Sequence, residues 1–178
     1  VKAIEMSSQP GGDGNAQFLS ANLGAVQDVS RNQLGANNNV TLSEVPDTVF
    51  PKLVAATINL GTKTVFITLS ETIDSTPKSL VSLSRVSILN ASDLNGNTLS
   101  GGTVQETDGI NITVAISEAQ RAAALYKSKT PGGDYSGTLL RVIPDAFQDI
   151  GQVRNQLNES VAVTEIPDSV PPVLASGA

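Results

Sequence analysis

The chain has 178 residues, 11 of them basic and 17 acidic, with a net charge of −6 and neither cysteine nor histidine. Scattered basic residues on an acidic chain do not make the basic stripe that nucleic-acid binding needs, and no apolar run reaches the roughly 20 residues of a membrane span. Without cysteine there are no disulfides or thiolate metal sites, and without histidine the commonest general base is missing.

Most of the chain shows the short period of β-strands. Val65, Ile67 and Leu69 alternate with polar or outward-facing residues, as on a half-buried strand. Valine, isoleucine and threonine are frequent, and glycine and proline interrupt the apolar segments. In chain order, the expected strands are 18–23, 40–45, 52–60, 64–70, 83–89, 99–107, 110–116, 137–143 and 160–166. The pattern predicts an all-β protein.

One segment, Ser117–Lys129, has the pattern of a helix instead. Ser117 is a suitable N-cap, and Gln120 stands three residues later as its capping-box partner. The Pro-Gly-Gly run at 131–133 ends the helix. Earlier in the chain, Asn95-Gly96 predicts a tight hairpin turn.

A long internal repeat organises the whole sequence. Glu44-Val45-Pro46-Asp47 returns 121 residues later as Glu165-Ile166-Pro167-Asp168. At the same offset, Pro-Gly-Gly-Asp occurs at 10–13 and 131–134, and Ala25-Val26-Gln27-Asp28 matches Ala146-Phe147-Gln148-Asp149. A fixed long period marks a tandem array. We therefore expect a complete module over 48–167, the end of another over 1–47, and the first strand of a third over 168–178.

The module over 48–167 contains seven expected strands and one short helix, which predicts an immunoglobulin-like β-sandwich. Residues 1–47 align only with the end of the helix and the last two strands. Two strands with unpaired edges are not stable alone. Two explanations stay open: the sequence is a window on a longer concatenated chain, or a neighbouring copy completes the fragment by donating strands.

Several of these segments resemble a known group of repeats. They are Pro46-Asp47 with Pro51, and the stretches 55–61, 67–74 and 146–149. They are similar to the tandem bacterial-type Ig-like repeats of very large secreted or surface proteins in bacteria and aquatic microbial eukaryotes. The resemblance implies stalks, adhesins or fibrils without catalysis, some of them extracellular filaments coated with glycan. Many of these relatives carry acidic calcium ligands at their module junctions, a pattern from which this chain departs.

The sequence contains four sequons for N-linked glycosylation, at Asn39, Asn90, Asn111 and Asn158. Asn111 lies out of phase with its apolar strand neighbours, so its side chain is expected to face solvent. We expect glycosylation of at least one sequon if the protein passes through a eukaryotic secretory pathway.

The module junctions offer few ligands for a metal. Calcium takes six or more oxygens, and the junction carboxylates are Glu44, Asp47, Glu165 and Asp168. The segment 93–97 superficially resembles a calcium loop, but Thr98 and Val104 stand where an EF-hand needs glycine and glutamate. The residues expected to mediate assembly at the junctions are Pro46, Asp47, Pro51, Pro167, Asp168, Pro171, Pro172, Val173 and Leu174.

The sequence therefore predicts a structural subunit of an extracellular filament or cell-surface stalk, whose partners are copies of itself in a polymer. The alternative is an adhesin module that binds a glycan or protein through loops 74–79, 91–97 and 128–136. We expect no enzyme, because no nucleophile–base constellation is present and tryptophan, the usual platform for sugars, is absent.

Overall fold

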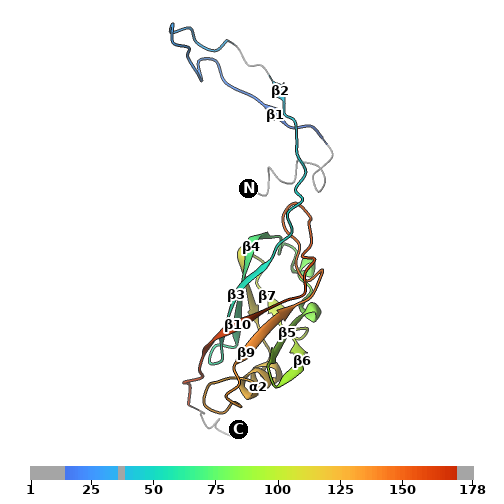
Figure 1. Ribbon diagram of the computed structural model, residues 1–178. Coiled ribbons are helices and arrows are strands. Elements are labelled where there is room, and N and C mark those ends of the chain that lie inside the picture. The colour runs from blue at the N-terminus through green and yellow to red at the C-terminus, as the bar shows by residue number, and fades with distance from the viewer. Residues whose placement is uncertain (1–14, 36–38, 172–178) are drawn as a thin grey trace, which may run out of the picture. The chain divides into compact units, whose positions relative to one another are not determined.

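The computed structural model describes residues 15–35 and 39–171, and the chain divides into two units with the main boundary between Thr48 and Val49. Each unit is considered by itself. The structure is mostly β, which confirms the expected all-β class (Figure 1). The strands of the second unit are β3 Leu53–Asn59, β4 Thr64–Ile73, β5 Val86–Asn90, β6 Asp93–Thr98, β7 Thr103–Val104, β8 Gly109–Ala115, β9 Thr138–Val142 and β10 Glu159–Ile166.

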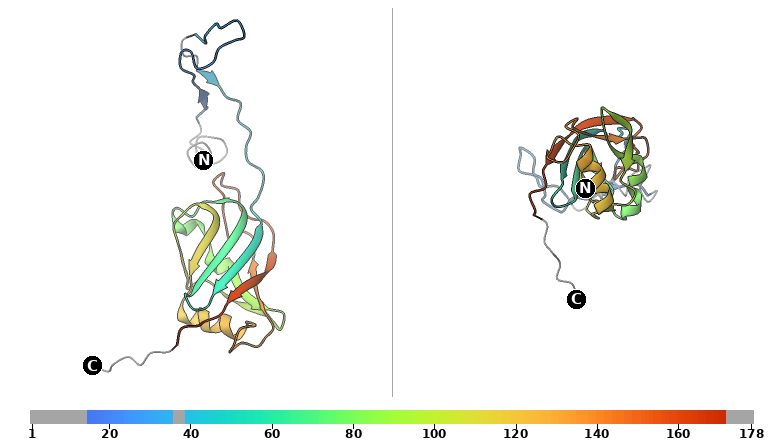
Figure 2. Two further views of the ribbon diagram at one scale, coloured as in Figure 1. Left: turned by 90° about the vertical axis from the view of Figure 1, so that its left-hand side faces the viewer. Right: turned by 90° about the horizontal axis from the view of Figure 1, so that it is seen from below.

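These eight strands form one mixed sheet in the order β6-β5-β9-β10-β3-β4-β8-β7. All neighbouring pairs are antiparallel except β10 and β3, which run parallel. The sheet curls so that its two halves enclose the interior, and helix α2 (Glu118–Tyr126, amber) lies across one end (Figure 2). The β10–β3 pair is thus the seam at which one half of the sheet continues into the other.

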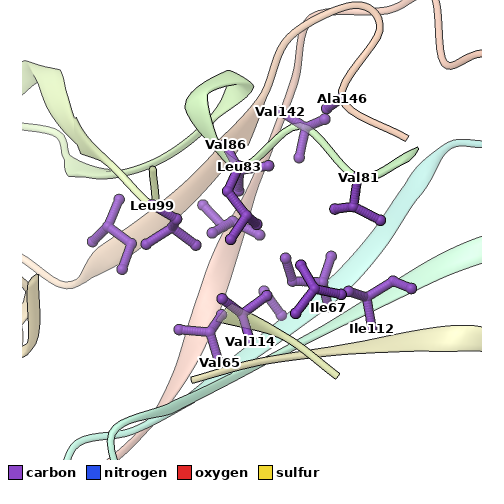
Figure 3. Close-up of a cluster of buried hydrophobic side chains, with 14 of the residues drawn as sticks. Val65, Ile67, Val81, Leu83, Val86, Leu99, Ile112, Val114, Val142 and Ala146 are labelled. Carbon is purple, nitrogen blue, oxygen red and sulfur yellow. The ribbon is translucent and has the colours of Figure 1, made fainter. Parts of the chain in front are cut away.

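The core lies between the two halves of this sheet. Val65, Ile67, Ile112 and Val114 point from the half containing β4 and β8 toward Val86, Val142 and other side chains of the opposite half (Figure 3). This follows from the strand period, because alternate residues of β4 and β8 face the same side and are the apolar ones.

The expected helix is present, and its start is confirmed. The Ser117 side chain accepts a hydrogen bond from the Gln120 backbone N–H, and the Gln120 side chain accepts one from Ser117 N at 2.9 Å. Both halves of the capping box are therefore formed. The helix ends at Tyr126, earlier than the predicted Lys129.

The structure has one strand more in this unit than the sequence predicted. Residues 93–98, where a turn was expected, form β6, so the predicted Asn95-Gly96 turn is wrong. The hairpin turns earlier, at Ala91-Ser92, because Asn90 pairs directly with Asp93. β6 is an edge strand with little burial on either face, so its sequence shows no alternation of apolar residues.

Three other strands of the second unit differ from the sequence prediction by more than one residue. Residues 83–85 form a 3₁₀ turn, Leu83–Arg85, so the strand predicted from Leu83 starts at Val86. A second 3₁₀ turn spans Lys78–Leu80. The weak strand predicted over 99–107 shrinks to β7. The strand predicted over 64–70 extends to Ile73 in β4.

The first unit contains the strands β1 (Phe18–Leu19) and β2 (Val40–Thr41), which pair antiparallel (Figure 1). They lie within the two strands predicted over 18–23 and 40–45. In the part of the chain that the structure describes, these two strands pair only with each other.

The first turn of α2 carries a cluster of charges. The Glu118 carboxylate accepts hydrogen bonds from Arg121 Nε at 2.9 and 3.0 Å and lies 3.0 Å from Lys63 Nζ. The Arg121 bonds, and next the Lys63 contact, lower the pKa of Glu118 from 4.5 to about 2. Because the folded state lowers this pKa, the carboxylate stabilises the fold above about pH 4.5 and loses that effect as pH falls toward 2.

We predict that Glu118→Gln lowers the urea midpoint of the second unit modestly at pH 7, because the carboxylate is exposed and screened by solvent. The difference between variant and parent should shrink steadily from about pH 4.5 to about pH 2. Urea unfolding at half-unit pH steps measures it. A difference that stays constant to pH 2 would contradict the lowered pKa.

Candidate functional site

The feature of the structure that bears most on function is the correspondence between two hairpins, β1–β2 and β9–β10. Phe18 pairs with Thr41 and Leu19 with Val40, while Leu139 pairs with Ala162 and Leu140 with Val161. Every member of the second set lies 121 positions after a member of the first. The period of the sequence is thus also the period of the strand register.

The loops between the paired strands follow the same rule. Each contains one isolated antiparallel bridge, at Gln27–Gln33 and at Gln148–Arg154. The backbone N–H of Asp28 donates to the Asn32 carbonyl, and that of Asp149 to the Val153 carbonyl, both at 3.0 Å. In both loops the aspartate Oδ1 accepts a bond back from residue 32 or 153, at 2.9 and 2.8 Å. Each aspartate therefore closes its own turn.

Left-handed backbone conformations recur at the same offset. Gly24 and Asp145 have φ of 75° and 63°, and Arg31 and Gln152 have φ of 69° and 66°. Non-glycine residues occupy this region only where the surrounding structure requires it. Three non-glycine types, aspartate, arginine and glutamine, adopt the left-handed conformation here. The backbone path is therefore set by its hydrogen bonds and only loosely by residue identity.

The repeated glutamate has the same task in both hairpins. Glu44 Oε1 accepts from Gln17 N at 2.8 Å, and Glu165 Oε1 accepts from Thr138 N at 2.7 Å. Glu165 Oε2 also accepts from Lys129 N. Glu44 Oε2 is buried with no hydrogen-bond partner among the described residues. The counterpart of Lys129 is residue 8, which lies outside those residues.

The two hairpins differ in what covers them. The side chains of Leu140 and Phe147 are fully buried at 0% exposure, whereas their counterparts Leu19 and Val26 are 59% and 62% exposed. Val163 packs against the core, while its counterpart Leu42 is 40% exposed. Repeat positions that are buried in the core of the second unit are therefore exposed in the first unit.

The four sequons lie in different surroundings. Asn39, Asn111 and Asn158 are exposed, and Asn111 faces outward as predicted, with Oδ1 accepting from Thr68. Asn90 is fully buried. Its Nδ2 donates to Asp134 at 2.7 Å, and its Oδ1 accepts from the backbone N–H of Ser92 and Asp93. The folded structure thus uses Asn90 to build the β5–β6 turn and leaves no access for a glycan.

The junction carboxylates Glu165 and Asp168 are engaged by protein groups. Asp168 Oδ2 lies 3.0 Å from Arg121 Nη1, and its Oδ1 accepts from Val170 N. Both oxygens of Glu165 accept backbone N–H groups, as described above. Glu71 and Asp149 bring carboxylate oxygens within 4.8 Å of each other. The hydrogen bonds and the ion pair give Glu165 and Asp168 structural roles, and the expectation of no cofactor, with calcium at the junctions as its alternative, stays untested.

Of the junction residues predicted to mediate assembly, Pro172, Val173 and Leu174 lie outside the described residues. Pro51 is buried just before β3, and Pro46, Asp47, Pro167 and Pro171 are exposed. Within the second unit, the Arg121–Asp168 ion pair joins helix α2 to the segment that follows β10.

The three loops considered for an adhesin are held by internal contacts. Residues 74–79 are fixed where the Asp108 carboxylate accepts from Ser75 N and Thr76 Oγ1. Residues 91–97 form the β5–β6 turn and most of β6. In 128–136, Ser128 and Thr130 are buried. A depression of about 340 Å³ over β9 and β10 contains no aromatic side chain among its lining residues. Nothing in these loops singles out a ligand.

Comparisons with protein-family models, curated proteins and solved structures gave no match to this chain. In the part of the chain that the structure describes, no helix combines the length and the apolar character required to cross a membrane.

We predict that one substitution has two different effects at equivalent positions of the repeat. Leu140→Ala should destabilise the second unit by about 2–5 kcal/mol, because it opens a cavity in a closed core. Leu19→Ala, in the first unit, should change the free energy of unfolding of the chain by less than about 0.5 kcal/mol, because the Leu19 side chain is exposed. Urea unfolding measures both. Equal effects would contradict the difference in burial.

We also predict that Asn90→Ala destabilises the second unit by about 1–3 kcal/mol, because it removes partners of Asp134 and of two backbone N–H groups. Asn158→Ala, at an exposed sequon, is the matched control and should be nearly neutral. Glycopeptide mapping of folded protein from a eukaryotic secretory host should find Asn90 unmodified. A glycan on Asn90 in that material would contradict the buried geometry.

Proposed function

We propose that the chain is a structural subunit of an extracellular filament or cell-surface stalk. The filament is assembled from copies of one module, by concatenation or by strand complementation. The observation that carries this proposal is the repeated hairpin, because the same register, turn bonds and left-handed residues occur twice at a fixed period. Arrays of such a unit gain stability by packing neighbours in sequence, and they extend in one dimension.

The module is of the immunoglobulin-like type in this proposal. If β3 to β10 are lettered A, B, C, C′, D, E, F and G, the sheet order gives ABED in one half and C′CFG in the other. These are the two sheets of an immunoglobulin-like sandwich. The core between the halves supports the same assignment (Figure 3). Parallel pairing of A with G is the contact that joins the halves.

A glycan coat is part of the proposal. Three of the four sequons are exposed, and they lie on separate segments: before β2, on β8 and before β10. Glycans at these asparagines would project from the surface without disturbing a buried contact. The acidic, polar surface of the chain suits a solvated extracellular polymer.

Negative-stain microscopy of the native material tests the proposal, with intact mass measured before and after deglycosylation. We predict filaments with an axial repeat and a mass that falls on deglycosylation. Monodisperse globular particles without filaments would overturn the proposal. Saturable binding to a glycan array by such particles would instead support an adhesin.

A further inference from the structure

The exposed hairpin of the first unit is built to receive specific strands. We propose that β1–β2 is completed by a segment of the same type as residues 48–121 of this chain. This segment places a β3-type strand parallel to residues 42–45, which continue from β2, and a β5-type strand antiparallel to β1. The inference deepens the tandem-array proposal and rests on it.

The second unit shows what a hairpin of this geometry binds. The outer edge of β10 pairs with β3 through Val163–Ala56 to Ile166–Asn59, and the bond from Leu60 N to Ile166 O extends the ladder. The outer edge of β9 pairs with β5, for example through Leu140–Ile88. β1 repeats the register of β9, and residues 42–45, which directly follow β2, correspond to the part of β10 that pairs with β3. We therefore expect the added strands to pair along β1 and along β2 with its continuation 42–45.

The register of the completed sheet follows from the offset. Leu42 is the counterpart of Val163 and is therefore placed opposite the counterpart of Ala56. Leu19 is the counterpart of Leu140 and is placed opposite the counterpart of Ile88. A shift of one residue would turn the apolar residues of the added strands away from the core. Only this register therefore places the apolar side chains of the hairpin and of the added strands on the same side of the sheet.

The exposed apolar residues of the first unit identify the rest of the partner. Val26 corresponds to Phe147, a core residue that packs in the cluster between the two halves of the sheet. An edge strand alone does not cover that position. Covering it requires the opposite half, which in the second unit is formed by β3, β4, β8 and β7. The partner is therefore a multi-strand segment.

The C-terminal residues 173–178 correspond in sequence to residues 52–57, the beginning of β3. If donated by a second copy, they would supply one strand along β2. They would leave the outer edge of β1 and the position of Val26 uncovered. The observations therefore favour the longer segment, and donation of 173–178 becomes an outcome of the test.

The test is an extension of the full chain. Residue 1 corresponds to Ala122, so placing a copy of residues 48–121 directly before Val1 restores the repeat without a gap. We expect backbone amides of β1 and β2 to exchange at least about 100-fold more slowly in the extended chain than in the 178-residue chain. Hydrogen exchange with mass spectrometry measures this, and the amides of β9 serve as the internal standard of a folded hairpin.

The control carries Ile67→Asp in the added copy only, which places a charge in the new core. Slow exchange of β1 and β2 in the extended chain, lost in this control, supports the proposal. Fast exchange in the extended chain, with β9 still protected, overturns it. Protection of the hairpin in the 178-residue chain that disappears when 173–178 are deleted also overturns it, in favour of donation by a second copy. Filaments in the native material are scored separately, so either proposal can fail alone.

Discussion

The parallel pairing of β3 with β10 is the contact on which the folded unit depends. It joins the first strand to the last, and the Glu159 carboxylate strengthens it by accepting from Leu53 N at 2.6 Å. More than 100 residues separate these partners, so forming the pair closes a long loop and costs chain entropy that the buried core must offset. With the pair in place, both halves of the sheet enclose one core. Without it, each half has a bare edge and a bare apolar face.

Among the described residues, the hairpin of the first unit has no strand that corresponds to β3. The hairpin keeps the strand register, the aspartate that closes the turn and the left-handed residues. All of these interactions are local in sequence, so they form without a β3-type strand. Burial is not local, and Leu19 and Val26 stay exposed. Local hydrogen bonding therefore defines the shape of the hairpin, and long-range pairing determines whether it has a core.

The same distinction explains what the sequence could predict. Alternation located β3, β4, β8, β9 and β10, because each has one buried face. The capping box located the start of α2 through two residues, Ser117 and Gln120. β6 was missed because an edge strand with two exposed faces leaves no period in the sequence. It exists because its neighbour β5 is buried throughout and needs a partner for its backbone groups.

At the candidate site, the sequence predicted the repeat and its offset, but not the surroundings of each acceptor. Asn90 has the same sequon pattern as Asn158. Only the structure reveals that Asn90 is fully buried and bonded to Asp134, a residue 44 positions away. Glu165 was likewise one of the few candidate metal ligands in the sequence, and only the structure places its two carboxylate oxygens on backbone N–H groups. Such contacts depend on tertiary pairing, which no local pattern encodes.

The residues that recur between the repeats are mostly those that hold the backbone. A Cβ at Gly133 would lie 2.1 Å from the Ser128 carbonyl oxygen, and glycine stands at the equivalent position 12. Asp134, Asp149 and Glu165 all accept backbone N–H groups, and each has an identical counterpart. The core positions are mixed: Phe147 corresponds to Val26, whereas Leu140 and Ala146 have the identical counterparts Leu19 and Ala25. The repeat therefore preserves the residues that fix the backbone path at each of these positions, whereas it preserves the side chains that fill the core at only some of theirs.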